Sequence, residues 1–243
     1  MVETNKVPLA IVTGAAHRLG RDLAVSLAHL GYAIVLHCFE SREEAIKTKE
    51  KIHSLGARAE IIQSDLRDPA EINRLFQAVD SFDCQLHVLV NSAAVMNPED
   101  LLAVGVDDFD SEISLNLRAP LLCAQQAAAR MDAGGLIVNI SDVGANKTWT
   151  GYPVYIMSKA GLESLTRLLA RALAPEIRVN AIAPGFVYQS KNLSQEEWEK
   201  LLAKVPMKRS ARPEEIVRTL EFLLKNEYVT GQTIVVDGGY SLV

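Results

Sequence analysis

The sequence predicts a single α/β domain: a doubly wound parallel sheet of about seven strands with helices on both faces. Short apolar runs alternate with amphipathic segments along the whole chain, and right-handed crossovers leave few other topologies for such a pattern. The runs lack polar alternation, as is typical of parallel strands covered on both faces. A length of 243 residues with 49% hydrophobic content suits one domain over residues 1–243.

The apolar runs give the expected strands and the segments between them the expected helices. In order, the strands are 7–12, 33–36, 59–62, 86–90, 136–140, 177–182 and 233–236. The helices are 20–30, 42–55, 69–79, 108–131, one beginning at 153, and 213–224. Gly31 and Gly56 are expected to end the first two helices, and Pro69, Pro153 and Pro213 to begin three others, because glycine suits helix ends and proline the first turn.

One long irregular stretch, residues 186–209, follows Pro184 and Gly185. Within it Ser194 is a good N-cap for a short charged helix over 194–202. Because ligands of such sheets bind beyond the carboxyl ends of the strands, this segment is a candidate substrate lid. A plain surface insertion is the alternative.

Composition excludes several classes of function. The net charge of −5 with scattered Lys and Arg gives no surface for nucleic acid or an anionic membrane. The three cysteines lack any metal-ligand spacing, which indicates reduced thiols. No apolar run reaches the ~18 residues of a membrane span, and the start lacks a signal-peptide core, so we expect a cytoplasmic protein with a small-molecule partner. In the acidic cluster Asp107, Asp108, Asp110 and Glu112, Asp108 or Asp110 is interpreted as negative charge in a helix's first turn, with no metal expected.

An acid/base pair is predicted where Pro153 begins a helix. Tyr155 and Lys159 lie at i and i+4 on one face of that helix. An ammonium one turn away should lower the pKa of the phenol from about 10 and ease proton transfer. The same spacing also occurs by chance on amphipathic helices, and Tyr152 is a second phenol that lacks such a lysine.

A glycine-rich turn joins the first strand to the first helix, over residues 13–20. Gly14 permits a tight turn and Gly20 close packing, so that a dinucleotide pyrophosphate can meet backbone amides at the helix N-terminus. Arg18 replaces the usual middle glycine, which weakens the motif, but its position after a predicted strand strengthens it.

Five motifs in register resemble the short-chain dehydrogenase/reductase family: Thr13-Gly14 with Leu19-Gly20, Asn91-Ser92-Ala93-Ala94, Asn116, Tyr155 with Lys159, and Asn180 with Pro184-Gly185. The resemblance implies a Rossmann-type, dinucleotide-binding reductase domain with hydride transfer, and a homotetramer. It implies cofactor contacts at Gly14, His17, Arg18, Leu19, Gly20, His37, Ser41, Asp65, Leu66, Asn91, Ala93, Tyr155, Lys159, Pro184 and Gly185. For Asp65, which would contact adenine, the alternative is a carboxylate that caps the helix at Pro69.

Asp142 stands thirteen positions before Tyr155, where most members of that family have a serine. The adjacent Ser141 should face the opposite side of the strand, because side chains alternate. An ionised carboxyl beside a ketone would oppose the negative charge that hydride addition creates. Beside an N-heterocycle it can accept from an amine or N–H and help relay a proton to a ring nitrogen.

The chain further resembles pteridine reductases, through Arg18, Leu36-His37, Asp142, the run from Asn116 to Pro120, and the tail from Val236 to Leu242. That resemblance implies NADPH-dependent reduction of a pterin or dihydropterin, sometimes a folate. Tyr155 would donate the proton, Lys159 would hold the nicotinamide ribose and acidify Tyr155, and Asp142 would assist the proton relay. Arg18 would contact phosphate and pterin, and Asn116 would support Lys159 through a water. Two residues depart from the pattern of pteridine reductases: Met96 stands in place of an aromatic that stacks on the pterin, and Val187 in place of a serine.

The choice of cofactor depends on residues after the second strand. Glu40 would repel a 2′-phosphate if it pointed inward, whereas His37, Ser41, Arg42 and Arg18 could bind one. NADP(H) is favoured, with NAD(H) as the alternative. Two other functions stay open: a carbonyl or 3-oxoacyl reductase that tolerates Asp142, and a nucleotide-bound sensor without turnover, against which an intact acid/base pair argues.

Overall fold

The computed structural model describes residues 6–190 and 193–243, and it places seven parallel strands in one sheet. The order across the sheet is β3-β2-β1-β4-β5-β6-β7. The strands are β1 Val7–Val12, β2 Ala33–Cys38, β3 Ala59–Gln63, β4 Cys84–Asn91, β5 Gly135–Ile140, β6 Ile177–Pro184 and β7 Thr233–Val236. The predicted fold class is confirmed.

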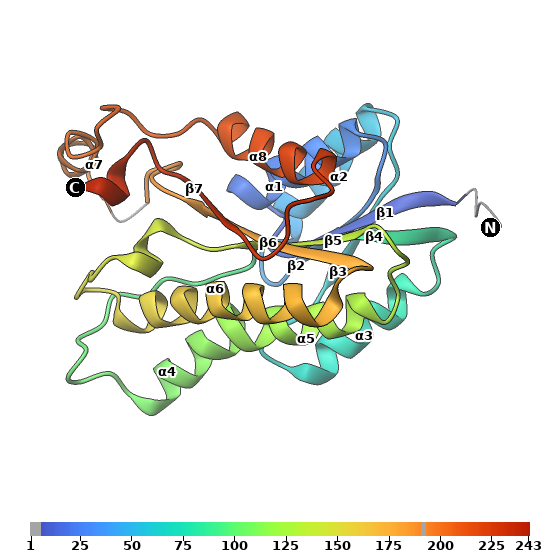
Figure 1. The fold of residues 1–243 in the computed structure, drawn as a ribbon, viewed down its shortest axis with the longest axis horizontal. Coiled ribbons are helices and arrows are strands. Elements are labelled where there is room, and N and C mark those ends of the chain that lie inside the picture. Colours follow the sequence, from blue (N-terminus) through green and yellow to red (C-terminus); the bar gives the residue numbers. More distant parts are fainter. Residues whose placement is uncertain (1–5, 191–192) are drawn as a thin grey trace.

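Helices cover both faces of this sheet (Figure 1). On one face lie α1 Arg18–His29, α2 Arg42–Ser54 and α8 Pro213–Lys225, and on the other α3 Pro69–Val79, α4 Val106–Ile113, α5 Ala119–Ala128 and α6 Pro153–Leu173. A shorter helix, α7 Gln195–Leu202, lies beyond the sheet near the C-terminus. Short 3-10 turns occupy Val143–Asn146 and Tyr240–Leu242. None of the helices in the described chain is long and apolar enough to cross a membrane.

The core consists of two apolar layers separated by the sheet. Along β1, Ala10 and Val12 belong to the layer under α1 and α8, whereas Leu9 and Ile11 belong to the layer over α3, α5 and α6. All residues of β2 and β5 are buried. Because both faces of these strands pack against helices, they show the continuous apolar pattern from which they were predicted.

The single helix expected over 108–131 is wrong in detail. The structure divides it into α4, a π-helical turn over Ser114–Arg118, and α5. Pro120 has no N–H to donate within a regular helix, and it stands near the start of α5. A π turn adds a residue to the local repeat and turns side chains to a new face. Asn116 stands in that turn, so the irregularity determines its direction.

Two turn predictions are confirmed by the backbone. Gly31 and Gly56 have φ of +90° and +79° just after α1 and α2, a conformation that glycine adopts without steric cost. The predicted cap of α7 is also present: Ser194 Oγ accepts from the Glu197 amide at 3.3 Å, and Glu197 accepts from the Ser194 amide at 2.8 Å. Of the candidate lid segment 186–209, the structure describes all residues except 191–192.

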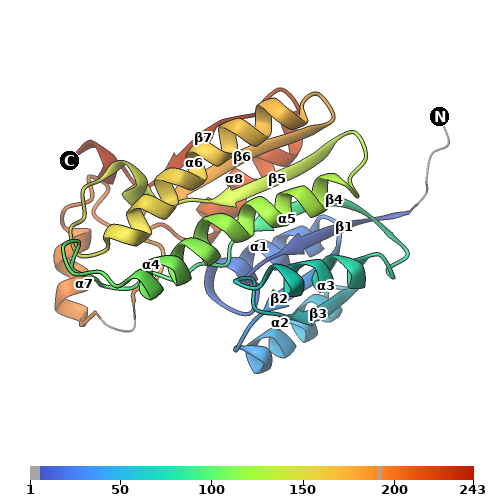
Figure 2. The same cartoon turned by 90° about the horizontal axis from the view of Figure 1, so that it is seen from below.

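The carboxyl ends of the strands share one edge of the sheet. The strand order reverses direction between β1 and β4, and the loops after these strands diverge there, which makes a ligand crevice. In Figure 2, α7 and the C-terminus lie beyond this same edge, beside the start of α6. The elements that carry the predicted site residues therefore meet at one end of the molecule.

Candidate active site

The glycine-rich turn packs backbone against backbone. Gly14 has φ of +64°, and a Cβ there would lie 2.9 Å from the Ala93 Cα. A Cβ on Gly20 would lie 2.2 Å from the Gly14 carbonyl oxygen. Thr13 Oγ1 accepts from the amides of Ser92 and Ala93 at 2.9 and 3.0 Å. The loops after β1 and β4 are therefore held together in a fixed backbone cradle.

The N-terminus of α1 has the chemistry of an anion site. Its N-cap, His17, makes no side-chain capping bond, and the first turn has no acidic residue. By contrast, α2, α3, α4, α7 and α8 all carry acidic side chains there. Free amides and the positive helix end favour a bound anion, so this turn fits a dinucleotide pyrophosphate. Leu19 is partly buried against the core and fixes the start of the helix.

Arg18 links the anion site to the lid. Its φ of +52° is the left-handed conformation that the usual glycine would supply. Its Nη2 donates to the Tyr188 carbonyl at 3.0 Å, and its guanidinium lies 5.4 Å from the centre of the Tyr188 ring. The Tyr188 hydroxyl in turn donates to Asp22 on α1. The first residues of the candidate lid segment are thus held against α1.

His37 does not supply a positive charge for a phosphate, which corrects that expectation. The side chain is 2% exposed, and its Nδ1 accepts from the Gly14 amide at 3.2 Å. The other ring nitrogen, Nε2, therefore carries the proton and donates to the Ser64 carbonyl at 2.9 Å. Burial lowers its pKa to about 4. A neutral His37 therefore positions the cradle through its hydrogen bond with the Gly14 amide.

The ribose end of the crevice is exposed. Phe39, Glu40 and Arg42 are exposed after β2, and Ser41 precedes α2 without using its hydroxyl as a cap. Arg42 donates to Gln63 at 3.4 Å, a long bond at the surface. Ser41 and Arg42 carry hydrogen-bond donors at this end that fit a 2′-phosphate.

Asp65 does not cap α3, since Asp68 accepts from the Ala70 amide there at 2.8 Å. Asp65 instead accepts from the Arg67 side chain at 3.0 Å. Partial burial opposes its charge, but the hydrogen bonds from Arg67 outweigh burial and lower its pKa. Leu66, between them, is 3% exposed and part of the core. An ionised Asp65 at the end of β3 keeps the predicted contact with adenine as a proposal.

The predicted catalytic residues converge from the loop after β5 and from α6. The Tyr155 hydroxyl donates to Asp142 Oδ2 at 3.0 Å. Lys159 Nζ donates to the Ile140 carbonyl at 2.8 Å and lies 5.5 Å from the centre of the Tyr155 ring. Ser141 turns away and donates to Glu163 at 3.1 Å. The prediction that Asp142, and not Ser141, faces the tyrosine is confirmed.

The expected acidification of Tyr155 is not found. Burial, then the charge of Asp142 and its hydrogen bond, raise the pKa of Tyr155 well above 10. Burial lowers the pKa of Lys159 to about 8, although Asp142 and Glu112 favour its charge. Burial also raises the pKa of Asp142. The carboxylate therefore holds the phenol in its protonated form, ready to donate.

Asn116 is hydrogen-bonded to the lysine helix through Ser158 and not to Lys159 itself. Its Nδ2 donates to the Val95 carbonyl at 2.8 Å and to Ser158 Oγ at 3.2 Å. Its Oδ1 accepts from the Val95 amide at 3.0 Å. The residue thus joins the loop after β4 to α6, and the water-mediated support of Lys159 stays a prediction.

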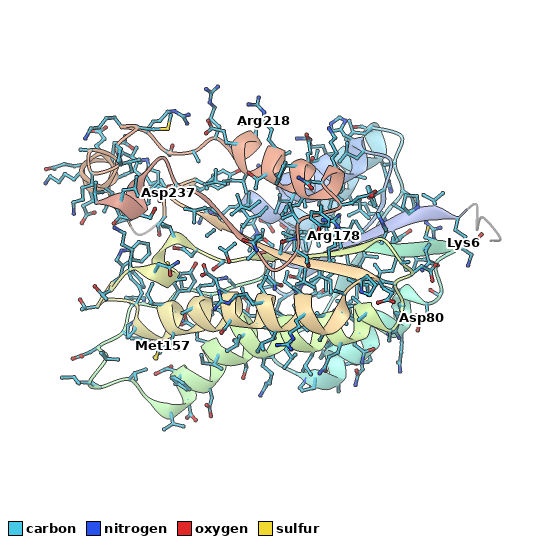
Figure 3. The ribbon with its side chains drawn as sticks, viewed as in Figure 1. Lys6, Asp80, Met157, Arg178, Arg218 and Asp237 are labelled. Atoms are coloured by element: carbon cyan, nitrogen blue, oxygen red, sulfur yellow. The ribbon has the colours of Figure 1, made fainter. Side chains whose placement is uncertain are left out.

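The remaining predicted residues have varied positions. Asn91 is buried and donates to Asn139 at 2.9 Å, so it fixes β4 against β5. Pro184 ends β6 in the core, and Gly185 packs so closely that a Cβ would lie 2.8 Å from the Asp237 Cα. Asp237 is labelled in Figure 3 near the end of β7. Met96 is 42% exposed, and Val187 packs on the core, so Met96 is the one open to a ligand.

One residue of the site was missed from sequence. Glu112 is 0% exposed and lies one helical turn before Asn116. It was placed in an acidic cluster at a helix N-terminus, although its spacing from Asn116 puts both on one face. Among the described residues, no group of three or more potential ligands could hold a metal.

The anion cradle, the tyrosine and lysine on one helix and the carboxyl beside them define a dinucleotide-dependent reductase site on a Rossmann-type sheet. The sequence profile of a family described as enoyl-(acyl carrier protein) reductase matches residues 14–241. The chain belongs to the short-chain dehydrogenase/reductase family.

Particular relatives within the family differ in their substrates. The chain is 35% identical over 237 residues to 3-oxoacyl-(acyl-carrier-protein) reductase FabG of Staphylococcus aureus, which covers 95% of this chain and 96% of FabG. It is 31% identical to an NADPH-dependent aldehyde reductase-like protein of Arabidopsis thaliana, over 96% of this chain and 93% of the relative. FolM alternative dihydrofolate reductase 1 from Brucella canis, solved complexed with NADP, has a TM-score of 0.92 and 32% identity, over 98% of this chain and 94% of that chain.

Proposed function

We propose that this protein is an NADP(H)-dependent reductase of a dihydropterin, or of a related reduced N-heterocycle such as dihydrofolate. The observation that carries the proposal is the carboxylate of Asp142, which accepts from Tyr155 at 3.0 Å where most of the family has a hydroxyl. The likeness to FolM alternative dihydrofolate reductase 1 supports the same substrate class.

Bound NADPH would supply the hydride. The cradle at Gly14 and the N-terminus of α1 would hold its pyrophosphate, Ser41 and Arg42 its 2′-phosphate, and Lys159 the nicotinamide ribose. The solved FolM complex with NADP supports this choice of cofactor.

The protein's own residues would move the proton. Asp142 has two oxygens and one is occupied by Tyr155, while the Gly144 amide donates to the other at 2.6 Å. An amine or N–H of the substrate would donate to Asp142 and displace part of this arrangement. The ring nitrogen of the C=N bond would then take the tyrosine proton as the carbon of that bond accepts hydride. Tyr155 would then regain a proton through the neighbouring Lys159. The exposed Met96 would line the substrate side.

The test follows nicotinamide absorbance with purified protein. NADPH and then NADH are offered with dihydrobiopterin and dihydrofolate, and with a 3-oxoacyl thioester as contrast. Turnover of a dihydropterin with NADPH that is lost in Tyr155→Phe is the expected result. Turnover of the thioester alone would overturn the proposal.

The relationship to FabG favours a second candidate, reduction of a 3-oxoacyl thioester. The variant Asp142→Ser separates the two. It should lose dihydropterin activity under the first proposal, and should gain ketone activity under the second without losing the native reaction.

A further inference from the structure

A buried carboxyl group lies beside the catalytic residues without a role in the reaction above. Glu112 stands on α4 and is 0% exposed. Both of its hydrogen-bond partners in the described chain are amides: Asn97 Nδ2 donates to its Oε2 at 3.1 Å, and Asn116 Nδ2 approaches its Oε1 at 3.5 Å. A carboxylate buried without a cation in contact is disfavoured, and it tends to hold a proton instead.

The link to the reacting groups is short. Asn116 Nδ2 is shared between the Val95 carbonyl, Ser158 Oγ and Glu112, and Ser158 stands directly before Lys159 on α6. The charge of Glu112 also acts on both catalytic side chains, favouring the ammonium of Lys159 and the phenol of Tyr155.

A second carboxyl group lies close enough to act on the first. Glu99, on the loop after β4, has an Oε2 atom that is buried with no hydrogen-bond partner among the described residues. Burial, then the charge of Glu99, raise the pKa of Glu112 to about 7, against the bonds from Asn97 and the charge of Lys159. Burial and the charge of Asp108 on α4 raise the pKa of Glu99 as well. The titratable groups that interact with Glu112 are therefore Glu99 on the loop after β4 and, on α6, Lys159 and Tyr155.

We propose that Glu112 is a positioning residue that holds a proton behind Asn116, and that its ionisation favours the protonated forms of Lys159 and Tyr155. Once Glu112 is ionised, its negative charge delays the loss of the lysine proton. The inference rests on the proposed function only where it concerns turnover, since the proton on Glu112 can be observed without a substrate.

The first test needs no activity. In protein labelled with carbon-13 at the glutamate carboxyl, we expect one resonance to titrate with a midpoint near pH 7, and to show a second, smaller inflection near pH 8 as Lys159 loses its proton. The resonance should vanish in Glu112→Gln, move to lower pH in Glu99→Gln, and lose its second inflection in Lys159→Met. It should remain in Glu163→Gln, a matched control on another buried glutamate.

The second test measures kcat against pH. Glu112→Gln keeps the acceptor for Asn116, and the exposed Asn97 can turn its amide to suit. Without the negative charge, the alkaline limb of the profile should move to lower pH by roughly half to one unit, and Glu112→Asp should restore part of the shift. A merely structural role would lower kcat without moving the limb.

The outcomes separate this inference from the proposed function. If every glutamate titrates in its ordinary range, or if the limb does not move, the role of Glu112 is wrong whatever the substrate. If the resonance near pH 7 and its coupling to Lys159 are found while no dihydropterin turns over, the inference stands and the proposed substrate is wrong.

Discussion

Charged groups at the catalytic end of the crevice are buried, whereas those at the ribose end lie in water. Tyr155 is 7% and Lys159 3% exposed, and burial is the largest influence on the pKa of each. Phe39 is 40% exposed, and its neighbours Glu40 and Arg42 are exposed too. Surface charges are screened by solvent and salt, so they steer a ligand, while buried ones change each other's ionisation. Burial, more than residue type, thus separates the groups proposed to do the chemistry from those proposed to select the cofactor.

The largest effect is expected at the buried end. Tyr155→Phe removes the proton donor and should lower kcat by roughly 10²- to 10⁴-fold, while NADPH affinity stays near that of the wild type. Tyr152→Phe is the matched control, a phenol three residues away at the helix boundary, and it should change kcat less than about threefold. Steady-state turnover and NADPH fluorescence titration measure the two quantities. A similar loss in both variants would contradict the assignment.

The glycine cradle between the two ends of the crevice should be nearly as sensitive to substitution. In Gly20→Ala the new Cβ would lie 2.2 Å from the Gly14 carbonyl, so the cradle must shift. We expect a loss of roughly 3 kcal/mol in the free energy of unfolding. Gly31→Ala meets no atom within 4 Å but keeps a φ of +90°, and should cost only about 1 kcal/mol. Chemical denaturation compares them. Because only Gly31 of the two has a positive φ, a loss at Gly20 no larger than that at Gly31 would show that the close contact at Gly20 is relieved at little cost.

The pH dependence of turnover tests burial directly. The pKa of Lys159 is lowered to about 8, so its ammonium is present below that pH and is lost as the pH rises through it. We expect kcat to fall about tenfold per pH unit on the alkaline side. An unburied lysine would hold its proton to about pH 10. If kcat stays constant up to about pH 10, Lys159 is exposed to water, and the contrast between a buried catalytic end and an exposed ribose end is wrong.

The smallest effect is expected at the exposed end. Glu40→Gln removes a negative charge beside Ser41 and Arg42 and should raise the preference for NADPH over NADH by roughly two- to fivefold at low salt, because exposed charges interact weakly. The gain should shrink at high salt as screening increases. The ratio of kcat/KM for the two cofactors at two ionic strengths measures it. Glu43→Gln, on the first turn of α2, is the control that should leave the ratio unchanged.

Local rules predicted much of the site. The proline at the start of α6 and the i, i+4 spacing placed Tyr155 and Lys159, and strand alternation separated Asp142 from Ser141. The same rules did not predict the π turn in which Asn116 stands, because it leaves no clear pattern in the residues. They also passed over Glu112, since its burial comes from a loop that precedes α4 by several residues. The homotetramer and the lid role of 186–209 stay predictions.

Patterns between near neighbours were enough to predict the parallel sheet, the glycine cradle and the proposed acid/base pair, because hydrophobic period, turn chemistry and helix spacing act over short distances along the chain. The ionisation of those residues depends on the folded protein. His37 is neutral because the core buries it and its Nδ1 accepts from the Gly14 amide. Tyr155 keeps its proton because α6 buries it against Asp142 of another element. Desolvation and the charges of distant segments arise only when the chain has folded, so no local pattern contains them.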